Sequence, residues 1–335
     1  MRRLLLRGIL PLVAVALSSF NVLAQETAQV HMVVTAESTN ESVSPADFDR
    51  RSVLVKQGKD SLQVSDWIPA RGDQAALQLF ILIDDTCSSS LGSHLDDLRA
   101  FINAQPASAS IAIGYMRNAN VTVVKDFTTD HEQVANALRL PLASLSSQDS
   151  PYLSLMSLLK RWPESKLRRE VLMVTDGIDR LRGYVPTTTP SRAPGRTTVP
   201  DRSASMPYIS PDVNTASEAS QRYGVIVHSI YAPGVGRADR NYYERQNGLN
   251  GLSKLSDETG GEASYLTAEN PVSFKPYTDR LQTILNNQYF LVFLAKPRKK
   301  AGLQRIKLDS DAPNTEFAAA DNVWVPAQTA ATPKK

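Results

Sequence analysis

The stretch LFILIDDTCSSS, residues 79–90, is an apolar run that ends in two acidic side chains and several hydroxyls. A second run, VLMVTDG at residues 171–177, has the same form. Short runs rich in Ile, Val and Leu that alternate with helical patterns are typical of buried parallel strands. Open parallel sheets bind ligands beyond the carboxyl ends of their strands, where the strand order reverses. The two runs therefore predict hard oxygen ligands at the top of a sheet, which suit Mg²⁺ or Ca²⁺.

The patterns around these runs follow the order of a doubly wound α/β domain. A helical pattern at 91–102 precedes two strands joined by a short turn at 117–120, which predicts an antiparallel edge hairpin. Pro151 directly after Ser150 predicts the start of another helix, before the second acid-tipped strand. With a strand order such as 3-2-1-4-5-6, the first and fourth strands are neighbours at the switch point. Those are the two strands that are followed by acidic residues.

The rest of the chain divides into segments that flank or interrupt this domain. We expect a β-hairpin extension at 25–75, the α/β domain at 76–295, and a C-terminal β extension with a flexible tail at 296–335. Six prolines among Thr, Ser and Arg predict an irregular insertion at 181–213, at the rim of the expected site. Its composition favours a surface loop, with a partner-selecting lid as the alternative.

The N-terminus has the form of an export signal. A basic start, an apolar stretch and small residues before Gln25 predict a secretory signal peptide at 1–24. Its removal takes three of the 37 Lys and Arg residues, which leaves 34 basic against 34 acidic residues. This balance, without a recognisable nucleic-acid motif, argues against nucleic-acid binding. No other apolar run approaches the ~20 residues of a spanning helix. We therefore expect an exported protein, periplasmic or secreted, with no integral membrane span after signal removal.

On these residues the chain resembles a von Willebrand factor A (VWA) domain, and within that family the secreted, VWFA-related variety found in Acidobacteria. The similar segments cover about residues 76 to 295. The family's metal ion-dependent adhesion site (MIDAS) uses Asp-x-Ser-x-Ser after the first strand, a Thr before a later helix and an Asp after the fourth strand. The resemblance implies a Rossmann-like fold and a bound Mg²⁺, or Mn²⁺ or Ca²⁺. It also implies one coordination position left for an acidic side chain of a partner protein.

Carried over residue by residue, the resemblance implies five metal-binding positions: Asp84, Thr86, Ser88, Ser150 and Asp176. Asp176 lies in the Thr-Asp-Gly sequence that follows the second apolar run. Ser150 matches the family's Thr position, but a helix-capping role is at least as well supported there, because Pro151 follows it.

The loop after the first strand allows two registers. The preferred register is Asp84-x-Thr86-x-Ser88, in which Thr86 occupies a position where the family has Ser. The alternative register, Asp85-x-Cys87-x-Ser89, fits the family's spacing to the next helix better. It puts a thiol where a hydroxyl belongs, and thiols are poor ligands for hard cations. We prefer the first register, with Cys87 turned away from the ion and acting as a small packed hydrophobe rather than a reactive thiol.

Three functions are compatible with these residues. We expect a non-enzymatic, exported module that binds a partner protein through the cation, because the sequence has no Gly-x-Ser-x-Gly elbow, no His-Glu-x-x-His motif and no phosphate-binding glycine loop. The alternative is a metal-assisted hydrolase in which Asp84 and Asp176 activate water. The absence of a neighbouring His or Lys as general base argues against it. The third function is a metal-free envelope scaffold with a degenerate site. Cys87 supports it, because a thiol in the expected metal-binding loop departs from the family's pattern.

Overall fold

The computed structural model describes residues 27–38, 50–163, 165, 167–181, 208–236, 242–265 and 272–328. The expected signal peptide and the middle of the expected insertion, 182–207, lie outside these residues. The end of that insertion is not irregular, because α4 begins at Pro211. Ser210 caps this helix and proline stands in its first turn, the same start signal that the sequence shows at Ser150-Pro151.

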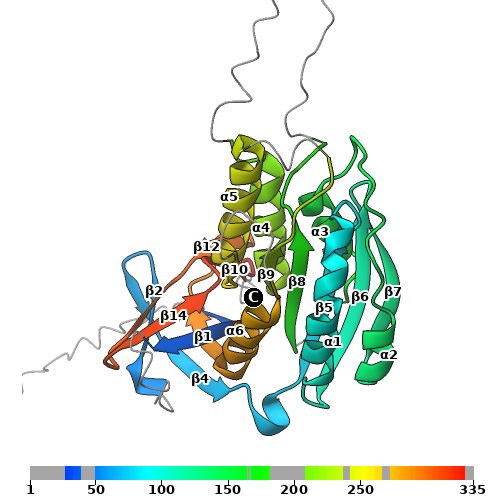
Figure 1. Cartoon of the computed structure of the whole chain (residues 1–335). Helices are drawn as coiled ribbons and strands as arrows, with labels where there is room; N and C mark the ends of the chain where they lie inside the picture. Colours follow the sequence, from blue (N-terminus) through cyan, green and yellow to red (C-terminus); the bar gives the residue numbers. More distant parts are fainter. Residues whose placement is uncertain are drawn as a thin grey trace, which may run out of the picture.

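A six-stranded sheet forms the centre of the molecule, in the order β10-β9-β8-β5-β6-β7 (Figure 1). Its strands are β5 (Leu77–Asp84), β6 (Ala109–Arg117), β7 (Asn120–Thr128), β8 (Arg168–Thr175), β9 (Val225–Tyr231) and β10 (Ala263–Ser264). Neighbouring strands are parallel except β6 and β7, which are antiparallel. If these six strands are numbered 1 to 6 along the chain, their order in the sheet is 6-5-4-1-2-3. This is the expected order, 3-2-1-4-5-6, read from the opposite edge. The predicted doubly wound sheet with one antiparallel edge strand is confirmed, and β5 and β8 are neighbours.

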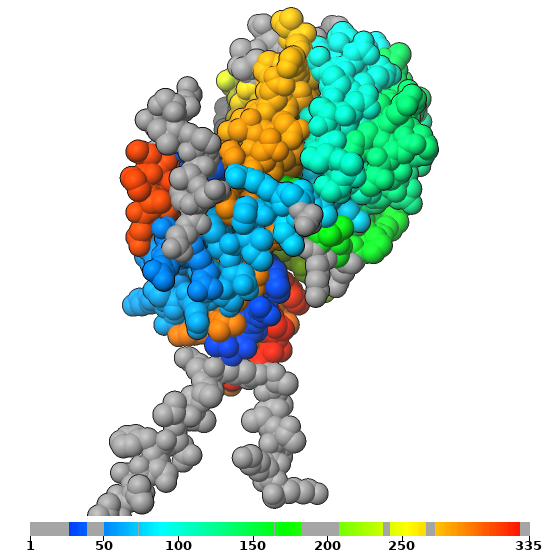
Figure 2. Space-filling view, turned by 90° about the horizontal axis from the view of Figure 1, so that it is seen from below, coloured from blue at the N-terminus to red at the C-terminus, as the bar shows by residue number. Residues whose placement is uncertain are grey.

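Helices cover both faces of this sheet. One face carries α1 (Leu95–Asn103), α2 (His131–Asn136) and α6 (Lys275–Asn286), and the other carries α3 (Pro151–Leu159), α4 (Pro211–Tyr223) and α5 (Tyr242–Thr259). Alternate residues of β5 enter the two apolar clusters, with Ile81 and Ile83 on one side and Phe80 and Leu82 on the other. Burial on both faces explains the unbroken apolar run. Figure 2 shows α6 beside α1 from below.

The segments before and after the α/β domain fold together. A second sheet has the order β14-β1-β11-β4, and the smaller sheets are β13-β2-β3 and β12-β15. The strands are β1 (Ala28–Ser38), β2 (Val53–Gln57), β3 (Asp60–Leu62), β4 (Val64–Pro69), β11 (Gln288–Ala295), β12 (Gly302–Arg305), β13 (Lys307–Ser310), β14 (Thr315–Ala319) and β15 (Asn322–Val325). They share one apolar core, and we call this part the β region.

One expected boundary differs from this arrangement. The boundary at residue 295 assigned β11 to the α/β domain, whereas β11 pairs with β1 and β4 in the β region. Its alternate residues Leu291, Phe293 and Ala295 enter that core, which fixes the strand there. Within the expected C-terminal extension at 296–335, the structure has strands as far as β15, which ends at Val325.

The β region packs against the lower part of the α/β domain and leaves the top of the sheet clear. It contacts α4, α5 and α6, and Figure 1 shows β8 pointing away from it. Short 3₁₀ helices occur at Arg50–Ser52 (η1), Gly72–Gln74 (η2) and Ser89–His94 (η3). Among the described residues, no helix has both the length and the apolar character needed to cross a membrane.

Candidate functional site

The carboxyl ends of β5 and β8 bring the two expected acidic residues into one cluster. The Thr175 hydroxyl donates to Asp84 Oδ2 at 2.7 Å and accepts from the Gly177 backbone N–H at 3.1 Å. Asp84 Oδ1 accepts from the Thr86 backbone N–H at 2.9 Å. Asp84 is only 3% exposed and Asp176 is fully buried. Both oxygens of Asp84 are therefore hydrogen-bonded within the protein, at the position where the sequence predicts a ligand site.

Arg180, which the sequence analysis did not single out, lies in this cluster. Its Nη2 is 2.5 Å from Asp176 Oδ2, and its Nη1 is 3.3 Å from Asp176 Oδ1. Nη1 also donates to Thr86 Oγ1 at 3.4 Å. The Arg180 side chain is 10% exposed, so this ion pair is almost completely removed from water. The cluster thus contains its own cation, which contacts both the segment after β8 and the loop after β5.

The loop after β9 closes over the cluster from a third side. The Ser88 N–H donates to the Pro233 carbonyl and the Val235 N–H to the Thr86 carbonyl, each at 2.9 Å. Between them, Gly234 approaches so closely that a Cβ there would lie 2.1 Å from Asp176 Oδ2 and 2.9 Å from Arg180 Nη2. This close approach of the backbone accounts for the burial of the charged pair.

Asp85, from the alternative register, makes a separate ion pair at the rim of the site. Arg139 donates to its two oxygens at 2.7 and 2.9 Å, and the Leu142 N–H donates to Oδ1 at 3.1 Å. The Arg139 guanidinium also lies over the Tyr115 ring, 3.6 Å from its centroid. Helix α2 ends at Asn136, and these contacts of Asp85 hold the segment that follows it as a loop.

The remaining expected ligands act as helix caps. The Ser88 hydroxyl accepts from the Ser90 N–H at 3.3 Å at the start of η3, and the Ser150 hydroxyl accepts from the Leu153 N–H at 3.3 Å at the start of α3. Ser89 is exposed. No hydrogen bond within the described part of the chain joins these three hydroxyls to Asp84, Asp176 or Arg180. The structure brings together Asp84, Thr86 and Asp176 of the five expected residues.

Cys87 lies in the apolar cluster beneath α1 and is fully buried. Burial, followed by the nearby Asp84 charge, raises the pKa of its thiol well above the ordinary value. Because the thiolate is the reactive form, we expect no reaction of the native protein with Ellman's reagent at pH 8. The urea-unfolded chain should release one equivalent of chromophore, since it has a single cysteine. Rapid modification of the native protein would contradict the buried position.

The Asp84 carboxyl gives a prediction about pH. Burial, followed by the Asp176 charge, raises the pKa of Asp84 from 3.8 to about 6. A carboxyl with a raised pKa in the folded state is costly to ionise there. This destabilisation is absent below pH 3.8, grows as the pH rises to 6 and is complete above it. Asp84→Asn removes it, so the variant should gain stability relative to wild type across this window.

The expected gain is about 3 kcal/mol, because the pKa rises from 3.8 to about 6 and each pKa unit corresponds to about 1.4 kcal/mol. Urea unfolding of wild type and Asp84→Asn at pH 4, 5, 6 and 7 gives the difference between their free energies of unfolding. The gain is the increase of that difference as the pH rises. The hydrogen bonds lost in the variant add a constant that does not depend on pH. A difference that stays flat from pH 4 to 7 would show that Asp84 ionises normally.

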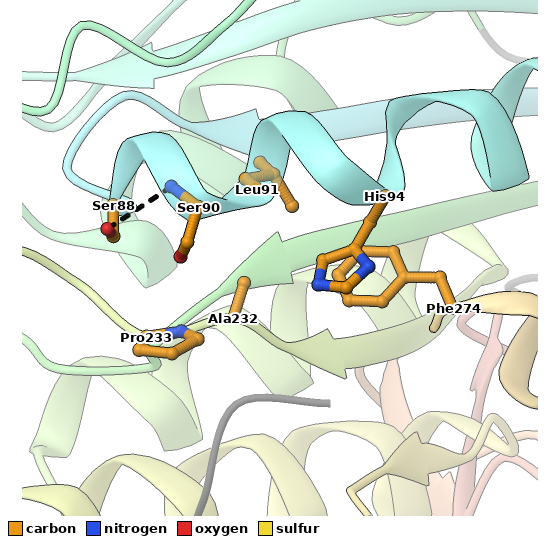
Figure 3. A pocket seen from close by; sticks show the side chains of 7 residues that line it. All are labelled: Ser88, Ser90, Leu91, His94, Ala232, Pro233 and Phe274. Atoms are coloured by element: carbon orange, nitrogen blue, oxygen red, sulfur yellow. Dashed lines mark hydrogen bonds between the residues drawn. The ribbon is translucent and has the colours of Figure 1, made fainter. Parts of the chain in front are cut away.

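A small cavity lies beside Ser88, between η3 and the residues that follow β9 (Figure 3). His94 and Phe274 line its far end, with ring centroids 4.5 Å apart in a stacked arrangement. Its volume is about 10 Å³, which accommodates no more than one water molecule. This cavity is therefore too small to bind an organic substrate.

The arrangement of these side chains does not fit Mg²⁺. A hard cation needs several free oxygen ligands in near-octahedral geometry. Here the oxygens of Asp84 accept hydrogen bonds from Thr86 and Thr175, and both oxygens of Asp176 bind Arg180. Within the part of the chain that the structure describes, no group of three His, Cys, Asp or Glu residues is arranged to hold a metal. The residues fit a guanidinium group instead.

Comparison with known proteins gives only distant similarity. No protein-family model matches the chain, and no curated protein matches it. A solved aerotolerance-related membrane protein from Bacteroides fragilis is 10% identical with a TM-score of 0.40, over 63% of this chain and 99% of that one. A von Willebrand factor type A protein from Catenulispora acidiphila is 10% identical with a TM-score of 0.41, over 93% and 76%. The vWF domain of the pili tip protein Mfa5 from Porphyromonas gingivalis is 12% identical with a TM-score of 0.37, over 63% and 94%. At these values the fold assignment rests on the strand order above.

Proposed function

We propose that this chain is an exported, VWA-type interaction module that binds a partner protein at the top of its central sheet. The doubly wound sheet, with acidic residues after its first and fourth strands, supports the VWA type. The export signal expected at 1–24 supports a periplasmic or secreted location. The proposed contact uses no divalent cation, because the buried Arg180 already occupies both oxygens of Asp176 and the contact is made by exposed side chains around the cluster.

The observation that carries this proposal is a set of exposed leucines in the loop between α2 and α3. Leu140 and Leu142 are each 52% exposed, and Leu145 is 42% exposed. Exposed apolar side chains that gather in one place mark interaction surfaces, whereas single ones are common. Asp85 fixes the loop through the Leu142 N–H and the Arg139 side chain. We call residues 140–145 the leucine loop.

Basic side chains near the leucine loop support a partner with acidic residues. Arg117 is exposed at the carboxyl end of β6, and the Arg139 side chain is 38% exposed beside the loop. Arg139 already binds both oxygens of Asp85, so the exposed Arg117 is the side chain that suits an Asp or Glu of a partner, because Arg forms bidentate hydrogen bonds with carboxylates. A segment with apolar residues next to acidic ones would match both features of this surface.

The hydrolase alternative has less support from these residues. A catalytic carboxylate must reach a water molecule or a substrate proton. Asp84 is bonded to Thr86 and Thr175, while Asp176 is bonded to Arg180 under the Gly234 loop. The metal-free form of the module is supported by the same contacts, because they use the oxygens that a metal would need.

Photo-crosslinking in the native host tests the proposed surface. We expect p-benzoylphenylalanine at position 142 to give a discrete crosslinked band with a partner protein. Position 167 is the matched control, because Leu167 is also exposed, at 43%, but precedes β8 at the other end of the sheet. Arg139→Ala should weaken the band from position 142. Equal bands from both positions, or none from position 142, would contradict the proposal.

A further inference from the structure

Backbone hydrogen bonds fix the loop that follows β8, and with it the position of Arg180. The Arg180 and Leu181 N–H groups donate to the Asp149 carbonyl at 2.9 and 3.1 Å. The Asp149 carboxylate in turn accepts from the Asn118 and Ser146 N–H groups at 2.8 and 2.6 Å. The loop is thus anchored to two other segments at the top of the sheet, and the guanidinium is held in place rather than free to leave.

Gly177 provides the turn that this position requires. Its φ of +70° is in the left-handed region, which glycine adopts without strain. A Cβ at this position would also lie 2.6 Å from the Gly248 carbonyl oxygen. The chain therefore turns sharply after Asp176, and the Arg180 side chain reaches back to the carboxylate four residues before it.

The charges of the cluster suit one resident cation. Two carboxyl groups, Asp84 and Asp176, are buried there, and burial of charge is costly unless it is paired. Burial of Arg180 alone would lower its pKa, but the charge and hydrogen bond of Asp176 raise it above the ordinary value. Arg180 is therefore charged at every physiological pH. A divalent cation entering beside it would meet electrostatic repulsion and no free carboxylate oxygen of Asp176.

We propose that Arg180 is the permanent cation of this site, that its guanidinium excludes divalent cations, and that its removal creates a divalent-cation site. Without the guanidinium, both oxygens of Asp176 and the Thr86 hydroxyl lose the bonds it donates. Asp84 remains beside them as a second carboxylate. These are the hard oxygen ligands that Mg²⁺ and Mn²⁺ prefer, and the space of the guanidinium is then open to the ion.

Titration of the full chain with MnCl₂, together with thermal unfolding in MgCl₂ or EDTA, tests this assignment. We expect wild type to bind no Mn²⁺ and to unfold at the same temperature in both media. Arg180→Ala should unfold about 10 °C lower in EDTA, because two buried carboxylates lose their counter-charge. Saturating MgCl₂ should restore about 5 °C of that loss, since the ion binds the folded state.

Two controls locate the effect. Arg139→Ala removes an arginine that is also paired with an aspartate at the top of the sheet, but outside the buried cluster, and it should create no cation site. The double variant Arg180→Ala, Asp176→Ala should lose the Mn²⁺ binding that the single variant gains. If Arg180→Ala does not fold, Arg180→Gln replaces it in the same titration, because glutamine is neutral and closer in size to arginine than alanine is.

Each outcome decides the inference. One equivalent of Mn²⁺ bound by wild type, and lost in Asp176→Ala, would overturn it and favour the metal site that the sequence resemblance implies. A folded Arg180 variant that binds no Mn²⁺ would overturn the claim that the guanidinium excludes the ion. These measurements involve no partner protein, so they stand or fall separately from the crosslinking at position 142.

Discussion

Replacement of Asp176 by alanine should lower the free energy of unfolding by about 3–5 kcal/mol, the cost of breaking a buried ion pair by removing one partner. Asp176 is fully buried, and the Arg180 side chain is 10% exposed. The variant leaves the guanidinium charged in a place that water hardly reaches. Urea unfolding at pH 7, followed by far-UV circular dichroism, measures the loss.

A surface ion pair provides the matched control. Asp279 pairs with Lys275 at 2.7 Å, with the same spacing of four residues, but the two side chains are 63% and 69% exposed. Exposed pairs of this kind contribute about 0.3–0.5 kcal/mol, so Asp279→Ala should change little. The double variant Asp176→Ala, Arg180→Ala should cost less than the sum of its single changes, because the two residues are in contact. Equal losses for Asp176→Ala and Asp279→Ala would contradict the buried pair.

Gly234→Ala should lower the free energy of unfolding by about 2–3 kcal/mol. Its Cβ would lie 2.1 Å from Asp176 Oδ2, closer than any real contact, so either the loop or the ion pair must move. Movement of the loop would strain its hydrogen bonds to Thr86 and Ser88. The same unfolding measurement applies, and a faster hydrogen exchange of the Val235 amide would locate the disturbance.

Gly302→Ala is the control for this change, because no atom lies within 4 Å of a Cβ at that position. It should leave stability unchanged within about 0.5 kcal/mol, as ordinary surface substitutions do. A Gly234→Ala protein as stable as Gly302→Ala would mean that the loop after β9 does not press on Asp176.

The central sheet was predictable because its signals are local. The apolar runs that became β5 and β8 end in turn residues, and Ser150-Pro151 marks the start of α3. A doubly wound sheet then leaves few possible strand orders. The acidic cluster at the carboxyl ends of β5 and β8 follows from the same reasoning, because parallel strands end at one edge.

Arg180 was not predictable from pattern, because its position depends on distant contacts. The loop after Asp176 has no hydrophobic period, and its course is set by Gly177 and by the Asp149 carbonyl from another loop. The metal expectation considered which oxygens the site could offer, but not which cation the chain itself could place among them.

The placement of β11 was also beyond the sequence pattern. An apolar run such as residues 288–295 fits either of two buried sheets, and its composition does not name its partner. Its neighbours are β1 and β4, from the opposite end of the described chain. Pairing over such a separation leaves no local signature.

The pairing of β1 with β11 has a consequence for how the protein folds. Val34 of β1 lies opposite Tyr289 of β11. Strand β1 therefore cannot pair with β11 until nearly the whole described chain has been synthesised. Contacts between such distant segments form slowly, because the loop must close first. We expect amides of β5 to become protected in pulse-labelling hydrogen exchange before those of β1, and the reverse order would contradict this. The nascent chain would then carry an unpaired N-terminal strand for much of its synthesis, and a chaperone that shields this strand would act at the most aggregation-prone stage.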